Sequence, residues 1–97
     1  MATTDEYIRL LGEFKRRHAA EYGIERMGIF GSVARGEQTE DSDVDIYIES
    51  DTISLFRMGG LLNDLEALLG TSVDIVRRHK YLRSTFVQRI MKDIVYV

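Results

Sequence analysis

The feature that most constrains the fold is the strict alternation of polar and apolar residues between Asp43 and Glu49. Successive side chains of a β-strand point to opposite faces, so this pattern predicts a strand with two unlike faces. Asp43 and Asp45 would share one face, with their Cα atoms about 6.5 Å apart. The residues expected to face the core are Val44, Ile46 and Ile48. Two carboxylates this close repel each other unless a cation lies between them or one is protonated.

Helical and strand patterns alternate along the rest of the 97 residues. Thr3 and Glu6 form a capping box that starts the first expected helix, and Gly23 ends it. Ser54 caps a second helix, which ends at Gly70. The other expected elements are strands at 24–30 and 71–76, a turn containing one helical turn at 31–36, a third long helix at 81–92, and a short strand or packed segment at 94–97. Strands that alternate with helices predict an α/β layer structure.

The second helix contains a local conflict at Gly59-Gly60. Two glycines inside a helix cost up to about 2 kcal/mol relative to alanines. Either the helix begins after the pair, or a close approach by another element requires small residues there. The expected core face of this helix consists of Leu55, Met58, Leu61, Leu62, Leu65, Leu68 and Leu69.

Length and composition limit the classes of function. The chain is long enough for one domain, residues 1–97, with one modest core. The absence of Cys excludes disulfide frameworks, thiolate zinc sites and cysteine nucleophiles. No apolar run approaches the length of a membrane span, and residues 1–5 lack the pattern of a secretion signal. These observations predict a soluble, cytoplasmic protein.

The formal net charge of −3 conceals an uneven distribution of charges. Seven acids and no base lie within 37–51, whereas six Lys or Arg and no acid lie within 75–92. An acidic cluster beside a basic one suits a site that holds both cations and phosphates. The charged faces of any small protein can produce the same distribution.

Four further residues are candidates for chemistry. Asp74 lies within an apolar run, so its strand would direct it away from the core. If this strand neighbours that of Asp43 and Asp45, three carboxylates converge, and such hard oxygen ligands suit Mg²⁺. Gly31 permits a sharp turn whose backbone N–H groups can bind phosphate, Ser32 adds a hydroxyl donor, and Arg35 adds a charged fork. Each feature alone is also typical of a solvated strand face or an ordinary turn.

Together these features are similar to the nucleotidyltransferase superfamily of DNA polymerase beta, and they closely resemble its minimal nucleotidyltransferase (MNT) branch. The residues that carry the resemblance are Phe30-Gly31-Ser32-Val33-Ala34-Arg35-Gly36-Glu37, Ser42-Asp43-Val44-Asp45-Ile46 and Val73-Asp74-Ile75-Val76. The resemblance covers essentially the whole chain. It implies an α/β (α+β) fold of the polymerase beta-like type, with a small mixed β-sheet of three to four strands and about three helices. The extra helical domain with which larger members hold an acceptor is missing.

The resemblance also implies an activity and roles for residues. A nucleoside monophosphate, expected to be AMP from ATP, would move to an acceptor hydroxyl with release of pyrophosphate, aided by two Mg²⁺ ions. Asp43 and Asp45 would bind Mg²⁺, and Asp74 would hold the second ion and help to deprotonate the acceptor. The expected nucleotide-binding residues are Gly31, Ser32 and, as a weaker candidate, Arg35.

Proteins resembling this branch are commonly the antitoxin half of a two-gene pair. Their partner is a helical HEPN-domain ribonuclease, which they silence by attaching adenylates to a tyrosine, so the resemblance implies a HEPN-domain toxin as partner. Two alternatives remain open: a module that masks its partner without catalysis, and a small-molecule nucleotidyltransferase that works as an oligomer. A membrane partner is not expected, because no apolar run is long enough to span a bilayer. Direct DNA binding is not expected, because this net-negative chain has no extended basic groove for a duplex.

Four residues near these motifs each have two possible roles. Arg77, Arg78 and Lys80 follow Asp74 and could steer the nucleotide or contact an acceptor, or they could form a solvated loop. Tyr47 is expected on the same face as the aspartates, where it could border the nucleotide or simply lie on the strand surface.

Overall fold

The computed structural model describes residues 2–97 and contains a four-stranded mixed sheet with four helices. Its strand order is β3-β2-β1-β4; β1 runs antiparallel to β2 and β4, and β2 runs parallel to β3. The elements are α1 (Thr4–Tyr22), β1 (Ile24–Phe30), α2 (Gly31–Ala34), β2 (Val44–Ser50), α3 (Leu55–Leu69), β3 (Val73–Arg77), α4 (Ser84–Asp93) and β4 (Val95–Tyr96). The predicted α/β class with a small mixed sheet is confirmed.

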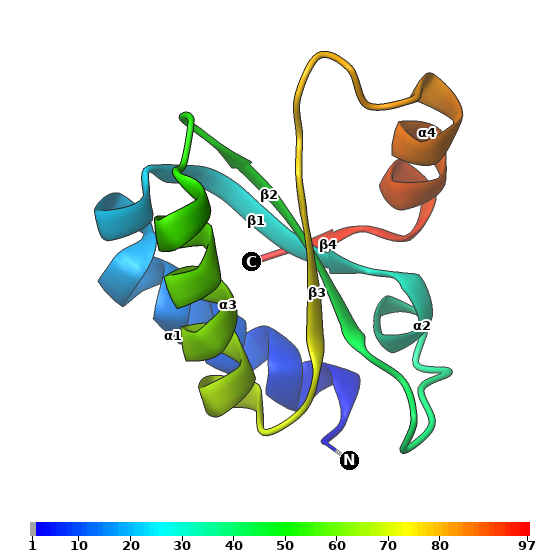
Figure 1. Ribbon diagram of the computed structural model, residues 1–97. Coiled ribbons are helices and arrows are strands. Elements are labelled where there is room, and N and C mark those ends of the chain that lie inside the picture. The colour runs from blue at the N-terminus through cyan, green and yellow to red at the C-terminus, as the bar shows by residue number, and fades with distance from the viewer. Residues whose placement is uncertain (1) are drawn as a thin grey trace.

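Helices α1 and α3 cover one face of the sheet, and α2 and α4 lie on the other side (Figure 1). The main core lies under α1 and α3, where the alternate residues of β2, namely Val44, Ile46 and Ile48, are completely buried. Burial of apolar side chains such as these supplies most of the driving force for folding. The two unlike faces predicted for this strand are therefore present.

Tyr47 lies on the other face of β2 and is completely buried, so neither expectation for this residue holds. It forms a second, smaller apolar cluster with Phe30 of β1 and Ile90 of α4. Its hydroxyl donates to Glu49 Oε2 at 2.7 Å and accepts from Arg78 Nη1 at 3.4 Å. Both expected roles required an exposed side chain. They were wrong because α4 packs on this part of the sheet and excludes solvent from Tyr47.

The helix ends follow the sequence signals closely. Thr3 and Glu6 form the capping box of α1, and Gly23 ends that helix with a φ of 67°. The Ser54 hydroxyl accepts from the backbone N–H of Arg57 at the start of α3. Gly70 ends α3 with a φ of 68°. The last helix differs from the prediction, because it begins at Ser84 rather than near residue 81.

One end of α3 departs from the expected core face. Leu61, Leu65 and Leu69 are buried as predicted, but Leu55 is 93 % exposed and the adjacent Phe56 is 90 % exposed. The first two residues of α3 therefore contribute nothing to the core, whereas Met58 packs against it. The apolar periodicity of the sequence could not reveal this, because the periodicity does not show where a helix leaves the sheet that it covers.

Neither explanation for the glycine pair in α3 is borne out. The helix begins at Leu55, before the pair. A Cβ built on Gly59 would meet no atom within 4 Å, and one on Gly60 would meet only the Tyr22 hydroxyl at 3.9 Å. Packing within the chain therefore does not require small residues at these positions.

Gly59→Ala is expected to stabilise the chain by about 1 kcal/mol, because alanine restricts the unfolded chain and favours the helix. Thermal unfolding should show a Tm higher by about 4–8 °C. Gly28→Ala is the contrasting control: its Cβ would lie 2.8 Å from the Val95 carbonyl oxygen, so β4 must shift and Tm should fall. An unchanged or lower Tm for Gly59→Ala would show that the pair has a structural role in the isolated chain.

None of the helices in the described residues is both long enough and apolar enough to cross a membrane.

Candidate active site

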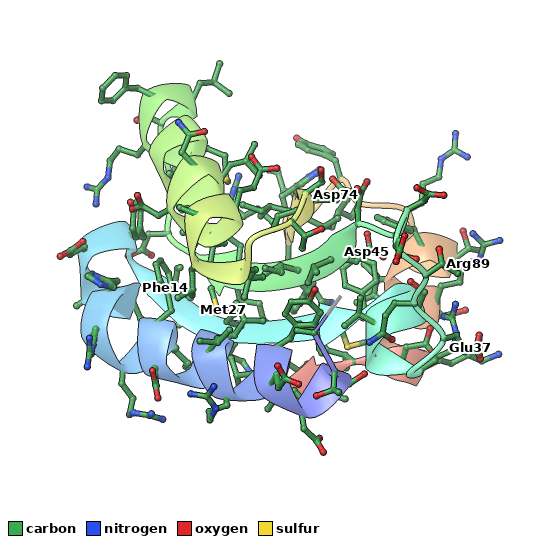
Figure 2. All side chains as sticks on the ribbon, turned by 90° about the horizontal axis from the view of Figure 1, so that it is seen from below. Phe14, Met27, Glu37, Asp45, Asp74 and Arg89 are labelled. Atoms are coloured by element: carbon green, nitrogen blue, oxygen red, sulfur yellow. The ribbon has the colours of Figure 1, made fainter. Side chains whose placement is uncertain are left out.

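Asp45 and Asp74 lie side by side on neighbouring strands. The two are register partners in the parallel pair β2–β3, and Phe30 of β1 is the partner of Asp45 on its other side. Directly opposed residues of adjacent strands direct their side chains to the same face. Figure 2 shows the two aspartates together, away from the space where Phe14 and Met27 pack. The adjacency of the two strands, on which a convergence of carboxylates depends, is thus observed, and Asp43 is exposed just before β2.

The negative charges of this region act on one another. The pKa of the Asp45 carboxyl is raised above its usual range, chiefly by partial burial and then by the charges of Asp74 and Asp43. Arg35 opposes this effect more weakly. Burial and like charges both disfavour an ionised carboxyl, so a bound cation would stabilise the ionised form of Asp45.

Gly31 is the first residue of α2, directly after β1, and it lies against Asp45. Its φ of 71° is in the left-handed region, which glycine adopts without steric cost. A Cβ built at this position would collide with Oδ2 of Asp45. The glycine is thus required both by the backbone conformation and by the close approach of the carboxylate. The half-buried Ser32 follows at once, so the predicted glycine-serine turn borders the carboxylates.

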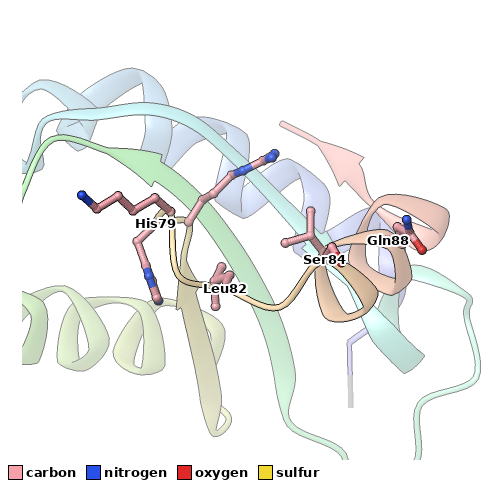
Figure 3. Close-up of a pocket in the computed structure, with 7 residues that line it drawn as sticks. His79, Leu82, Ser84 and Gln88 are labelled. Atoms are coloured by element: carbon pink, nitrogen blue, oxygen red, sulfur yellow. The ribbon is translucent and has the colours of Figure 1, made fainter.

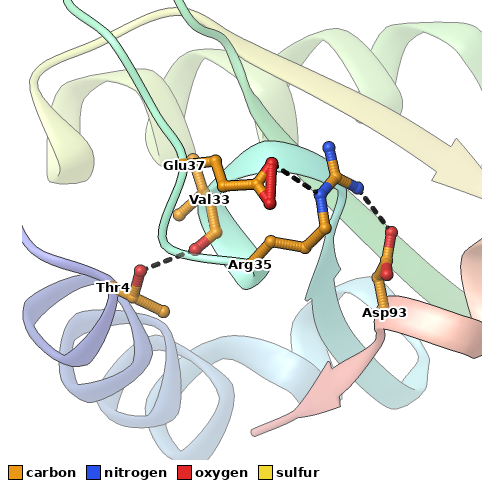
Figure 4. Close-up of polar contacts among 5 residues, drawn as sticks. All are labelled: Thr4, Val33, Arg35, Glu37 and Asp93. Carbon is orange, nitrogen blue, oxygen red and sulfur yellow. Dashed lines mark hydrogen bonds and ion pairs between the residues drawn. The ribbon is translucent and has the colours of Figure 1, made fainter.

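The short helix α2 is held from two sides (Figure 4). The Thr4 hydroxyl at the start of α1 donates to the Val33 carbonyl at 2.6 Å. Arg35 donates through Nη1 to Asp93 at the end of α4 at 2.6 Å, and through Nε to Glu37 at 3.3 Å. Charge-assisted bonds of this kind are stronger than neutral ones. Arg35 is thus oriented by two carboxylates beside the glycine-serine turn.

The donor chemistry of the site suits Mg²⁺, which prefers carboxylate oxygens. Within residues 2–97, no Lys, Arg or His lies within ion-pair distance of Asp43, Asp45 or Asp74. The same residues contain no preformed group of three His, Asp or Glu side chains placed to hold a metal ion. The convergence of all three aspartates on Mg²⁺ therefore stays a prediction.

The basic residues that follow β3 lie away from the carboxylates. Arg78 and Lys80 line a cavity of about 460 Å³ between the end of β3 and the start of α4 (Figure 3). Arg78 is four positions after Asp74, which places their Cα atoms about 13 Å apart along an extended strand. These cations are therefore not immediate neighbours of Asp74.

A second cavity, of about 350 Å³, lies between α2 and α4 beside Gly31. Its α4 side includes Phe86, Arg89, Lys92 and Asp93. Arg89 and Lys92 belong to the basic segment 75–92, but none of the four was a named candidate for the site. Their helical spacing could have placed them on one face. No signal in the sequence shows that this face lies opposite Gly31.

Known proteins similar to this chain include nucleotide-transferring enzymes. A family model described as a nucleotidyltransferase domain matches residues 8–97. The chain is 39 % identical over 98 residues to the protein adenylyltransferase MntA of Thermococcus cleftensis, covering 100 % of this chain and 98 % of that protein. It is 36 % identical over 101 residues to a provisionally named protein adenylyltransferase of Methanocaldococcus jannaschii, covering 100 % of both.

Two solved structures share the fold. One, provisionally described as a minimal nucleotidyltransferase, has a TM-score of 0.79 and 32 % identity, covering 97 % of this chain and 95 % of that chain. The other is a tri-AMPylated Shewanella oneidensis HEPN toxin in complex with its MNT antitoxin. Its matching chain has a TM-score of 0.70 and 17 % identity, covering 97 % of this chain and 71 % of that chain.

Proposed function

Since this chain belongs to the nucleotidyltransferase domain family, we propose that it is a protein adenylyltransferase, which transfers AMP from ATP to a hydroxyl of a partner protein. The observation that carries the proposal is the similarity, over their full lengths, to proteins named protein adenylyltransferases. The position of Asp45, between Asp74 and Gly31, supports it.

In the proposed reaction the acceptor oxygen forms a bond to the α-phosphorus of ATP. The bond from that phosphorus to the oxygen bridging to the β-phosphorus breaks, and its electron pair leaves with pyrophosphate. Asp74 is assigned as the carboxylate that accepts the proton of the acceptor hydroxyl. Mg²⁺, held by Asp43, Asp45 and Asp74, would supply the positive charge that offsets the phosphate oxygens.

The remaining proposed roles concern the triphosphate. Because Gly31 has no side chain, the Asp45 carboxylate can lie directly against the turn whose backbone N–H groups are assigned to the phosphate. Ser32 is assigned as a hydroxyl donor to the phosphate oxygens, and Arg35 as a charged donor whose orientation Asp93 and Glu37 set. Fixed donors of this kind stabilise developing charge without reorganisation during the reaction.

We propose a HEPN-domain toxin as the partner and a single nucleotidyltransferase domain over residues 1–97. Solved structures with the same fold include a HEPN toxin complex and a toxin-antitoxin structure with AMP-PNP, an ATP analogue. A protein partner would supply the acceptor hydroxyl from its own surface.

The proposal is tested by incubating the chain with Mg²⁺, ATP labelled at the α-phosphate, and the product of the neighbouring open reading frame. We expect label on that protein, no label without Mg²⁺, and loss of toxicity after labelling. Absence of label on this and every other acceptor would contradict the proposal. If the double variant Asp43→Asn, Asp45→Asn still neutralised the toxin in cells, masking without catalysis would replace it.

A further inference from the structure

The cavity between α2 and α4 opens beside the proposed reaction centre. Gly31 and Arg35 lie on its α2 side, and Arg89, Lys92 and Asp93 lie on its α4 side. Its volume of about 350 Å³ is within the range of small-molecule sites, roughly 300–1,000 Å³. The cavity is therefore large enough to receive part of a nucleotide.

The cavity lies on the face of the sheet that carries the aspartates. Phe30 and Ile90 contribute to its lining, and both belong to the small apolar cluster on that face. Phe30 is the register partner of Asp45, and Gly31 follows it. A phosphate chain lying along Gly31 would thus have Asp45 at one end and the cavity at the other.

The charges around the cavity favour an anion. Arg35 is already paired with Asp93 and Glu37. In the described part of the chain, Arg89 and Lys92 form no ion pair. The lining therefore carries three cations and one carboxylate, and the two α4 cations are available to a ligand.

We propose that this cavity binds the β- and γ-phosphates of the nucleoside triphosphate, with Arg89 and Lys92 as their contacts from α4. The inference rests on the proposed function and adds two binding residues to its site. The planar guanidinium of Arg89 can donate hydrogen bonds to two phosphate oxygens, and the ammonium group of Lys92 supplies a localised positive charge. Together they would select a triphosphate over a monophosphate and hold the pyrophosphate as it leaves.

The test compares the binding of AMP-PNP and of AMP, both with Mg²⁺, by titration calorimetry. Arg89→Ala and Lys92→Ala should each raise the Kd for AMP-PNP about tenfold, because each removes a charge-assisted contact. The Kd for AMP should change less than about twofold, because AMP lacks both phosphates. Arg89→Lys should recover part of the lost affinity.

Arg83→Ala is the matched control, because Arg83 is an exposed cation at the other end of α4 and does not line the cavity. It should leave both Kd values unchanged. The inference is overturned if Arg89→Ala and Lys92→Ala behave like Arg83→Ala, or if they weaken AMP as much as AMP-PNP.

The label-transfer assay separates this outcome from failure of the proposed function. A wild-type chain that transfers AMP while both α4 variants bind AMP-PNP normally overturns the inference alone. A wild-type chain that transfers no AMP, but binds AMP-PNP through Arg89 and Lys92, overturns the proposed function and leaves the phosphate site in place.

Discussion

Asp45→Asn is expected to reduce the rate of AMP transfer by at least about 1,000-fold, because it removes the carboxylate between Asp74 and Gly31 that is proposed to bind Mg²⁺. The label-transfer assay measures this loss. Asp51→Asn is the control, because Asp51 is an exposed acid just past the other end of β2. Transfer by Asp45→Asn within about tenfold of the wild type would contradict the assigned role.

The same variant should be more stable than the wild type without Mg²⁺. The folded-state pKa of Asp45 is raised above its ordinary value of 3.8. Its favourable contribution to the free energy of unfolding is therefore complete below that value and is lost as pH rises through the raised pKa. At pH 7 we expect Asp45→Asn to have a higher Tm than the wild type, an advantage that shrinks as pH falls toward 4. Thermal unfolding across this pH range measures both effects, and Mg²⁺ should stabilise the wild type more than the variant.

Gly31→Ala is expected to reduce AMP transfer by at least about 100-fold and to destabilise the fold by about 2–3 kcal/mol. Alanine at a φ of 71° is strained, and its Cβ would collide with the Asp45 carboxylate. Displacement of that carboxylate misplaces a group on which the proposed chemistry depends. Label transfer and urea unfolding measure the two losses.

Gly70→Ala is the control that distinguishes the effect of backbone strain from the effect of the collision with Asp45. Gly70 has a nearly identical φ of 68°, but a Cβ there would meet no atom within 4 Å. We expect this variant to lose about 1 kcal/mol of stability and to retain its activity. If Gly31→Ala were equally active after correction for stability, close packing of Gly31 on Asp45 would be irrelevant to the reaction.

Local patterns predicted most of the elements. The alternation in β2, the capping box at Thr3 and the helix end at Gly70 each depend on a few neighbouring residues, and each is observed. The errors arose where a distant element decides the outcome. Tyr47 is buried because α4 docks on its face, and Leu55 is exposed because α3 extends beyond the packed part of the core.

In the candidate site, too, local features could be predicted and long-range ones could not. The residues of the motifs could be selected from the sequence, but the register of Asp45 with Asp74 depends on the order of strands in the sheet. The pairing of Arg35 with Asp93 joins residues 58 positions apart. The α4 side of the phosphate cavity was missed for the same reason, since Arg89 is brought opposite Gly31 only by the folded chain.

The two bonds that hold α2 imply an order of assembly. Thr4 and Val33 are 29 positions apart, and Arg35 and Asp93 are 58 apart, whereas β1 and β2 are consecutive strands. Distant contacts form against a larger loss of chain entropy, so the central hairpin is expected to form before α2 is held in place. A partly folded chain would then have its central strands before α2 is fixed, and the proposed nucleotide binding would appear only after the hairpin has formed.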